Sequence, residues 1–201
     1  MDTRKLLLTA QDIRQMKGEQ KVHFLNPNAV RINKSLGDAV GLRHMGIHLI
    51  QIETGKESTE YHLHHYEEEA VYVLSGKGTL TMEDDQYPIA PGDFVGFPCH
   101  TAAHSIINDG TETLECLVIG QRLDQDVTDY PNQHKRLYRN NGEWNLVDMA
   151  DILVLRESAQ EQEIYEARNI RYPAVVALPD GKCHRRLCAC RYPQVGVRAV
   201  L

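Results

Sequence analysis

Three histidines and one glutamate have the types and the spacing of a metal site. His62 and His64 lie two residues apart in a stretch predicted to be a β-strand, so both imidazoles point to one face. Glu69 opens the next predicted strand, and His104 opens another after a second turn-rich passage. These donors suit one divalent transition metal (Mn, Fe, Co, Ni or Zn) and argue against a thiolate cluster or an all-oxygen calcium site.

The neighbouring residues offer one alternative ligand. Strand parity lets Glu67 or Glu69 face the site, but not both Glu68 and Glu69. The distance to Gly76 selects Glu69, and Glu68 is the alternative. His65 faces the opposite way from its neighbour and is predicted to be a surface histidine.

Residues outside the predicted ligand set are weaker candidates for catalysis. His48 shares one face of a predicted strand, 46–52, with two isoleucines, so it could line a cavity, although a packing role is the alternative. Tyr72 and His100 are the other titratable candidates.

Two motifs carry a resemblance to a known family. The pattern G-(x)n-H-x-H-(x)4-E-(x)6-G, followed by P-G-D-(x)4-P-(x)5-H-(x)3-N, resembles the paired motifs of the cupin superfamily. The first motif is matched by Gly55, His62, His64, Glu69 and Gly76, and the second by Pro91, Gly92, Asp93, Pro98, His104 and Asn108. His100 stands where cupins usually have glycine, with one extra residue before the motif histidine. The resemblance covers roughly residues 26 to 149.

Short strands separated by tight turns predict a sandwich or a small barrel. Together with the resemblance, they lead us to expect an all-β fold, the double-stranded β-helix or jelly-roll cupin barrel. We expect an N-terminal arm with a short helix starting at Thr9 (1–40), a barrel core (41–120), a barrel-covering segment (121–150) and a mixed C-terminal extension (151–201).

Composition limits the partners. The chain has 201 residues, a net charge of −6 and a pI near 5.9. An acidic chain without a long basic run does not favour nucleic acid or an anionic membrane as a partner, so a small-molecule ligand is expected. With no apolar run long enough to span a bilayer and no signal-peptide pattern, we predict a cytoplasmic location. Open sheet edges, and the pairing common in cupins of this size, predict a homodimer.

The cysteines do not form a disulfide framework. Cys99 and Cys116 are isolated and are predicted to be packing thiols, although Cys99 could touch the cavity mouth. Cys183, Cys188 and Cys190 cluster near the C-terminus, at a spacing that matches no standard zinc module. A basic terminal arm is the expectation for that region.

Two functional hypotheses of different class follow. In the first, the protein is a metal-dependent enzyme acting on a small oxygen-rich substrate, as an isomerase, a lyase or decarboxylase, or a dioxygenase. In the second, it is a non-catalytic module that binds a small molecule on the metal. The resemblance implies the fold and the metal site but leaves the substrate open.

Overall fold

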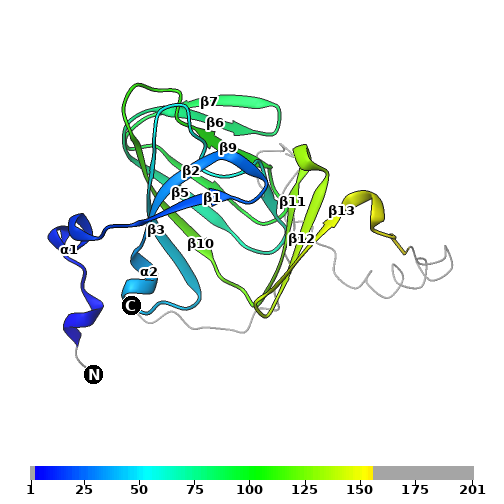
Figure 1. Ribbon diagram of the computed structural model, residues 1–201, viewed down its shortest axis with the longest axis horizontal. Helices are drawn as coiled ribbons and strands as arrows, with labels where there is room; N and C mark the ends of the chain where they lie inside the picture. Colours follow the sequence, from blue (N-terminus) through cyan, green and yellow to red (C-terminus); the bar gives the residue numbers. More distant parts are fainter. Residues whose placement is uncertain (1–2, 156–201) are drawn as a thin grey trace, which may run out of the picture. The chain divides into compact units, whose positions relative to one another are not determined.

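The computed structural model describes residues 3–155, and most of its regular elements are β-strands (Figure 1). The chain separates into two compact units, Met1–Leu153 and Val154–Leu201, and the first contains every element described below. The Cys183, Cys188 and Cys190 cluster lies outside the described residues. The strands are β1 (Glu19–His23), β2 (Asn26–Ser35), β3 (Met45–Ile52), β4 (Leu63–His64), β5 (Glu69–Ser75), β6 (Gly78–Met82), β7 (Asp85–Ile89), β8 (Phe94–Phe97), β9 (His104–Ile107), β10 (Leu114–Gln121), β11 (Gln125–Tyr130), β12 (Lys135–Asn140) and β13 (Glu143–Asp148).

The helices of the described part are short. α1 (Ala10–Gln15) begins after Thr9, whose hydroxyl accepts a hydrogen bond from the backbone N–H of Asp12, while the Asp12 carboxylate accepts the Thr9 N–H in return. α2 (Leu36–Ala39) connects β2 to β3. The remaining helices are 3-10 turns: Thr3–Leu6, Pro131–Gln133 and Met149–Asp151. None of these described helices has the length and apolar character needed to cross a lipid bilayer.

The strands form three antiparallel sheets. A six-stranded sheet has the order β1-β2-β3-β10-β5-β8, a four-stranded sheet the order β13-β12-β11-β4, and a three-stranded sheet the order β7-β6-β9. This arrangement is the predicted all-β jelly roll. Because β2 pairs with β3, the main sheet starts within the segment that we expected to be an N-terminal arm.

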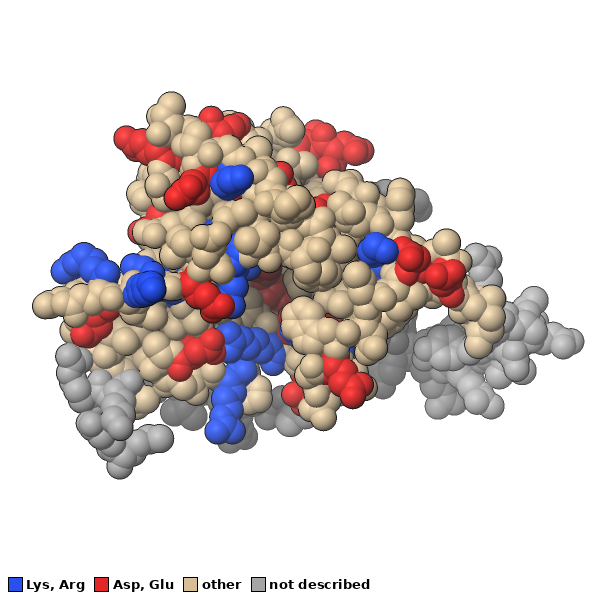
Figure 2. Space-filling model, viewed as in Figure 1, with Lys and Arg blue, Asp and Glu red and all other residues tan. Residues whose placement is uncertain are grey.

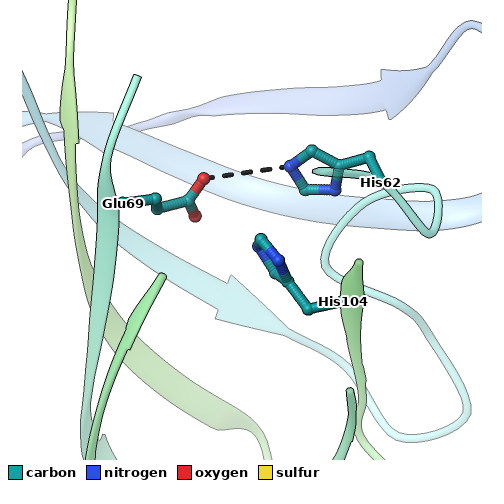
Figure 3. A group of neighbouring side chains, drawn as sticks. All are labelled: His62, Glu69 and His104. Carbon is teal, nitrogen blue, oxygen red and sulfur yellow. Dashed lines mark ion pairs between the residues drawn. The ribbon is translucent and has the colours of Figure 1, made fainter. Parts of the chain in front are cut away.

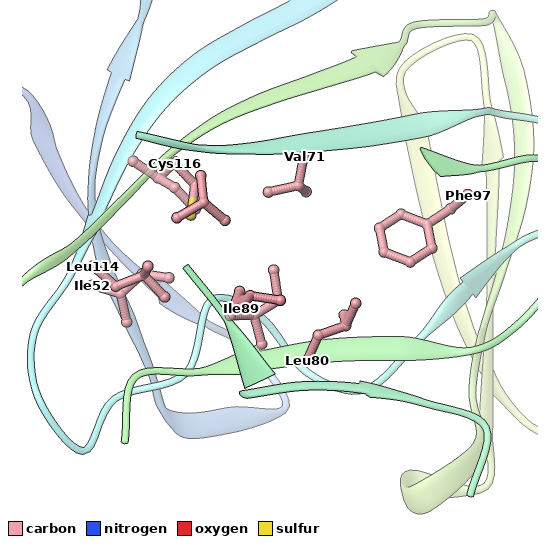
Figure 4. Packing of buried hydrophobic residues seen from close by; sticks show 10 residues of the cluster. Ile52, Val71, Leu80, Ile89, Phe97, Leu114 and Cys116 are labelled. Atoms are coloured by element: carbon pink, nitrogen blue, oxygen red, sulfur yellow. The ribbon is translucent and has the colours of Figure 1, made fainter. Parts of the chain in front are cut away.

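The core lies between the six-stranded and three-stranded sheets (Figure 4). It consists of alternate residues from the facing strands, because strand side chains point to opposite faces in turn. The buried cluster contains Ile50, Ile52, Val71, Val73, Leu80, Ile89, Phe97, Ile106, Leu114 and Cys116. Burial raises the pKa of the Cys116 thiol to about 12, and the Glu115 charge adds to the shift, so this cysteine is an inert packing residue.

Shortening one core side chain by a methylene is expected to destabilise the barrel measurably. Ile52 is completely buried, so Ile52→Val should lower the free energy of unfolding by about 1 kcal/mol, through lost transfer energy and a small void. Ile47→Val removes the same group from a half-buried position on the same strand and should cost less than half as much. Urea denaturation of both variants measures the difference. Equal losses would contradict the assigned core.

Candidate metal centre

The backbone places two of the predicted ligands side by side. The His62 N–H donates to the His104 carbonyl at 3.1 Å, and the His104 N–H donates to the His62 carbonyl at 2.8 Å. Their imidazole rings are therefore neighbours, with centroids 4.6 Å apart. Phe97 stacks on the His104 ring with centroids 3.4 Å apart, which shields that face of the imidazole from water.

Glu69, the first residue of β5, faces the histidines from the main sheet. Its Oε2 lies 3.9 Å from Nε2 of His62 and 3.9 Å from Nε2 of His64. Figure 3 shows the Glu69 carboxylate directed toward His62, with the His104 ring beside both. The four predicted ligands thus come together. The possible ligand atoms of His62, Glu69 and His104 lie within 4.8 Å of one another.

Two backbone carbonyls orient the imidazoles of His62 and His104. Nδ1 of His62 is 2.9 Å from the Glu60 carbonyl oxygen, and Nδ1 of His104 is 3.2 Å from that of Ala102. Because a carbonyl oxygen only accepts, each Nδ1 carries the proton, and each Nε2 has a lone pair available. Nε2 of His104 is buried without a hydrogen-bond partner in the described residues. A buried lone pair of this kind fits a metal ion, which would supply the missing partner.

His64 is oriented by a carboxylate from a different sheet. Its Nδ1 lies 2.6 Å from Oδ2 of Asp126, which is 3% exposed and also accepts from the Thr128 hydroxyl at 3.1 Å. The second oxygen of Asp126 accepts the backbone N–H groups of Tyr66 and Glu67. Histidine ligands commonly donate their other N–H to a carboxylate in this way.

The electrostatics favour an ionised Glu69 carboxylate beside a neutral His104 imidazole. Burial would raise the pKa of Glu69, but the neighbouring imidazoles, His62 foremost and then His104 and His64, outweigh it and hold the pKa at about 2. Burial lowers the pKa of His104 to about 4, and His62 adds to the shift. Burial also disfavours His64 protonation, but Asp126 outweighs it and raises the His64 pKa.

A second group of possible ligand atoms is His64, Glu67 and Asp126. Its members already have strong partners, because His64 and Asp126 bond to each other. Glu67 accepts from Arg139 and, at 2.6 Å, from the Leu123 N–H. We therefore place the candidate metal at the first group, where the His104 nitrogen lacks a partner.

The candidate centre opens onto a cavity of about 540 Å³, a volume typical of small-molecule sites. Figure 2 shows basic side chains beside a hollow on this face of the molecule. Gly46 and Gly120 oppose each other across β3 and β10, and both line the cavity. A Cβ on Gly46 would lie 3.1 Å from Nε2 of His48, whereas one on Gly120 would meet no atom within 4 Å.

Of the three weaker candidates, only His48 lines this cavity. Its Nδ1 lies 3.2 Å from the Asn33 amide nitrogen, and its Nε2 lies 3.4 Å from the Arg122 guanidinium. Burial lowers the His48 pKa, and Arg122 lowers it further. Both ring nitrogens therefore already have neighbours, which makes His48 a link between β2 and Arg122.

Tyr72 and His100 lie outside the cavity lining. Tyr72 is 40% exposed on β5, three residues from the inward-facing Glu69 and hence on the opposite face. His100 lies in the turn before β9, with φ 56°, and its ring contacts those of His65 and Tyr66. His65 is also more than a surface residue, because its Nε2 pairs with Asp129 at 2.9 Å.

Sequence reasoning missed Asp126, which belongs to the segment expected to cover the barrel. The residues Asp126, Thr128 and Tyr130 are all buried and share one face of β11. The polar side chains at every second position of this stretch were the signal in the sequence that they share one face of a strand. Nothing in the sequence, however, indicated that β11 pairs with β4, where Thr128 opposes His64.

The fold and the site together define a β-barrel with a candidate mononuclear metal centre inside. Residues 48–120 match the family model described as a cupin domain. This part of the chain is a cupin domain.

Three known proteins are similar to this chain in sequence or in structure. The chain is 92% identical to a protein of Acidithiobacillus ferrooxidans, provisionally named a sugar phosphate isomerase, whose crystal structure matches with a TM-score of 0.77 over 78% of this chain and 100% of that one. A sugar phosphate isomerase of the cupin superfamily from Silicibacter pomeroyi matches at 23% identity and a TM-score of 0.61, covering 69% of this chain and 93% of that one, which shows the shared fold. An uncharacterised Methanocaldococcus jannaschii protein is 29% identical over 95 residues, 47% of this chain and 66% of that protein, slightly less than two thirds of its length.

Proposed function

We propose that this protein is a metal-dependent isomerase of sugar phosphates. The observation that carries the proposal is the convergence of His62, His64, Glu69 and His104 at the wall of a cavity large enough for a small molecule. The name given to the Acidithiobacillus ferrooxidans relative, at 92% identity, supports this class of substrate. The proposal selects the isomerase among the enzyme types that the sequence left open.

A divalent ion in this centre would act as a Lewis acid that polarises the substrate carbonyl and so acidifies the neighbouring C–H group. The protein's own contribution is to hold the three imidazoles in one tautomer, with Nδ1 protonated and Nε2 facing the cavity. Glu69 supplies a negative charge that partly neutralises the ion. Mn, Fe, Co, Ni and Zn all suit this donor set.

Aromatic side chains lie over the cavity close to the candidate centre. Tyr130 is 4% exposed, and its ring lies 6.3 Å from that of His62. The rings of His23 and Phe24, at the tip of the β1–β2 hairpin, lie 5.4 and 5.9 Å from the same tyrosine. This packing restricts the access of water to the site, which strengthens electrostatic interactions there.

We also propose that the protein pairs as a homodimer. Three apolar side chains, Tyr72, Leu74 and Phe94, are 40%, 41% and 67% exposed on β5 and β8. Since Tyr72 and Phe94 are register partners at the edge of the main sheet, they form one continuous apolar surface that a second copy could cover.

The assay that tests the function is incubation of metal-loaded protein with aldose and ketose phosphates, followed by NMR of the sugar carbons. We expect aldose and ketose phosphates to interconvert, and Glu69→Gln to abolish this activity. Hydroxy acids, keto acids and catechols, the last with oxygen uptake, test the lyase and dioxygenase alternatives. If no compound reacts and mass spectrometry finds a retained small molecule, the non-catalytic binding module is the better description.

A further inference from the structure

The basic side chains of the cavity are not equivalent. Four of them line it: Lys21, Arg31, Arg122 and Arg139. Three of the four form ion pairs with carboxylates: Lys21 with Glu19, Arg122 with Asp38, and Arg139 with Glu67. Within the part of the chain that the structure describes, Arg31 is the cavity cation without a carboxylate in contact.

Arg31 also has unused hydrogen-bond donors. Its guanidinium donates one hydrogen bond to the Ser58 carbonyl, and its other N–H groups meet no acceptor among the described residues. Burial lowers the Arg31 pKa, and the charge of Glu69 offsets only part of the shift. A half-buried guanidinium with free donors is suited to an anion, and its planar fork matches a phosphate group.

His23 also lines the cavity, and it lies close enough to Arg31 for the Arg31 charge to affect it. Its Nδ1 accepts the backbone N–H of Leu25 at 3.2 Å, so in the neutral ring the proton is on Nε2. Burial, followed by the charges of His62 and Arg31, lowers the His23 pKa to about 4, which keeps the ring uncharged near neutral pH. No described residue accepts a hydrogen bond from that Nε2–H group.

We infer that Arg31 and His23 form the phosphoryl subsite of the cavity. They would bind the phosphate of the sugar phosphate, while its carbonyl end faces His62, Glu69 and His104. Ser58 and Thr59 line the cavity as well. This inference rests on the proposed function, because a sugar phosphate substrate needs a binding site for its phosphate group in addition to the metal centre. It adds an orientation of the substrate that the metal centre alone does not define.

Inorganic phosphate tests the subsite without any turnover. Calorimetric titration of the metal-loaded protein should give a Kd that rises about 100-fold in Arg31→Gln and about 10-fold in His23→Phe, in the range expected for lost charge-assisted hydrogen bonds. Phe at position 23 keeps a ring against Phe24 and Tyr130 but removes the donor. Arg31→Lys should fall between the wild type and Arg31→Gln, since it keeps the charge and loses the fork. Circular dichroism and metal content should be unchanged in all three variants.

Lys21→Gln is the matched control, because it removes one positive charge from the cavity lining at a side chain already paired with Glu19. It should change phosphate affinity by less than about 3-fold. An equal loss in Lys21→Gln would overturn the subsite, as would acetate binding as tightly as phosphate. Phosphate binding that survives Arg31→Gln but disappears on metal removal would place the anion on the metal and also overturn it. Phosphate binding as expected, without any isomerisation, would count against the proposed function alone.

Discussion

Glu69→Gln and His104→Ala are each expected to leave the purified protein nearly free of divalent metal. The amide of Gln has no charge to neutralise the ion, and removal of the His104 imidazole takes away the buried Nε2 that lacks another partner. Losing a direct ligand should weaken binding by more than the roughly 10- to 100-fold cost of losing an outer partner. Elemental analysis of untagged protein, prepared without chelators, should therefore fall from about one equivalent of Mn, Fe, Co, Ni or Zn to below about a tenth.

Glu68→Gln is the control for this experiment, because it makes the same chemical change on the neighbouring, exposed residue. It should retain the metal. Retention in Glu69→Gln together with loss in Glu68→Gln would identify the alternative carboxylate as the ligand. Full retention in both Glu69→Gln and His104→Ala would mean that any bound metal is held elsewhere.

Asp126→Asn is expected to weaken metal binding about 10- to 100-fold although Asp126 is not placed as a ligand. The carboxylate accepts the Nδ1–H of His64 at 2.6 Å and thereby fixes the ring with Nε2 toward Glu69. Burial would raise the Asp126 pKa, but the His64 hydrogen bond and two backbone amides lower it to about 2, so the group is ionised at neutral pH. Asn removes that charge and can present its NH2 group to His64, which favours the wrong tautomer.

Competition with a chromophoric chelator at fixed pH measures the change in metal affinity. Asp129→Asn is the matched control on the same strand, because the Asp129 carboxylate pairs with His65 and Arg136 and not with His64. It should alter thermal stability while metal affinity stays within about 3-fold of the wild type. Equal weakening in both variants would indicate that β11 acts by general destabilisation instead of through His64.

Sequence motifs predicted the fold, and they named candidate ligands that the structure brings close together, for a physical reason. Strand parity and turn residues are local signals. The positions of Glu69 at the start of β5 and His104 at the start of β9 could therefore be predicted from the sequence alone. The same parity excludes Tyr72 from the cavity once Glu69 faces inward. His100 was harder to place, because a turn has no fixed face.

The remaining site residues depend on contacts between distant segments. Arg31 is on β2, which we assigned to an N-terminal arm, and Asp126 is on β11, which we assigned to a covering segment. Each reaches the cavity through strand pairing, β2 with β3 and β11 with β4. One sequence does not specify such pairings, so neither residue could be assigned a role in advance.

The opposed glycines Gly46 and Gly120 affect the shape of the cavity, and they do not belong to the set of candidate metal ligands. The missing side chain of Gly120 leaves open space along the cavity wall, whereas a Cβ on Gly46 would lie 3.1 Å from side-chain atoms of both Arg122 and His48. Gly120 is the register partner of Glu69 on β5, and a Cβ there would meet no atom within 4 Å. Alanine at position 120 would therefore narrow the cavity beside Glu69 without replacing any candidate ligand.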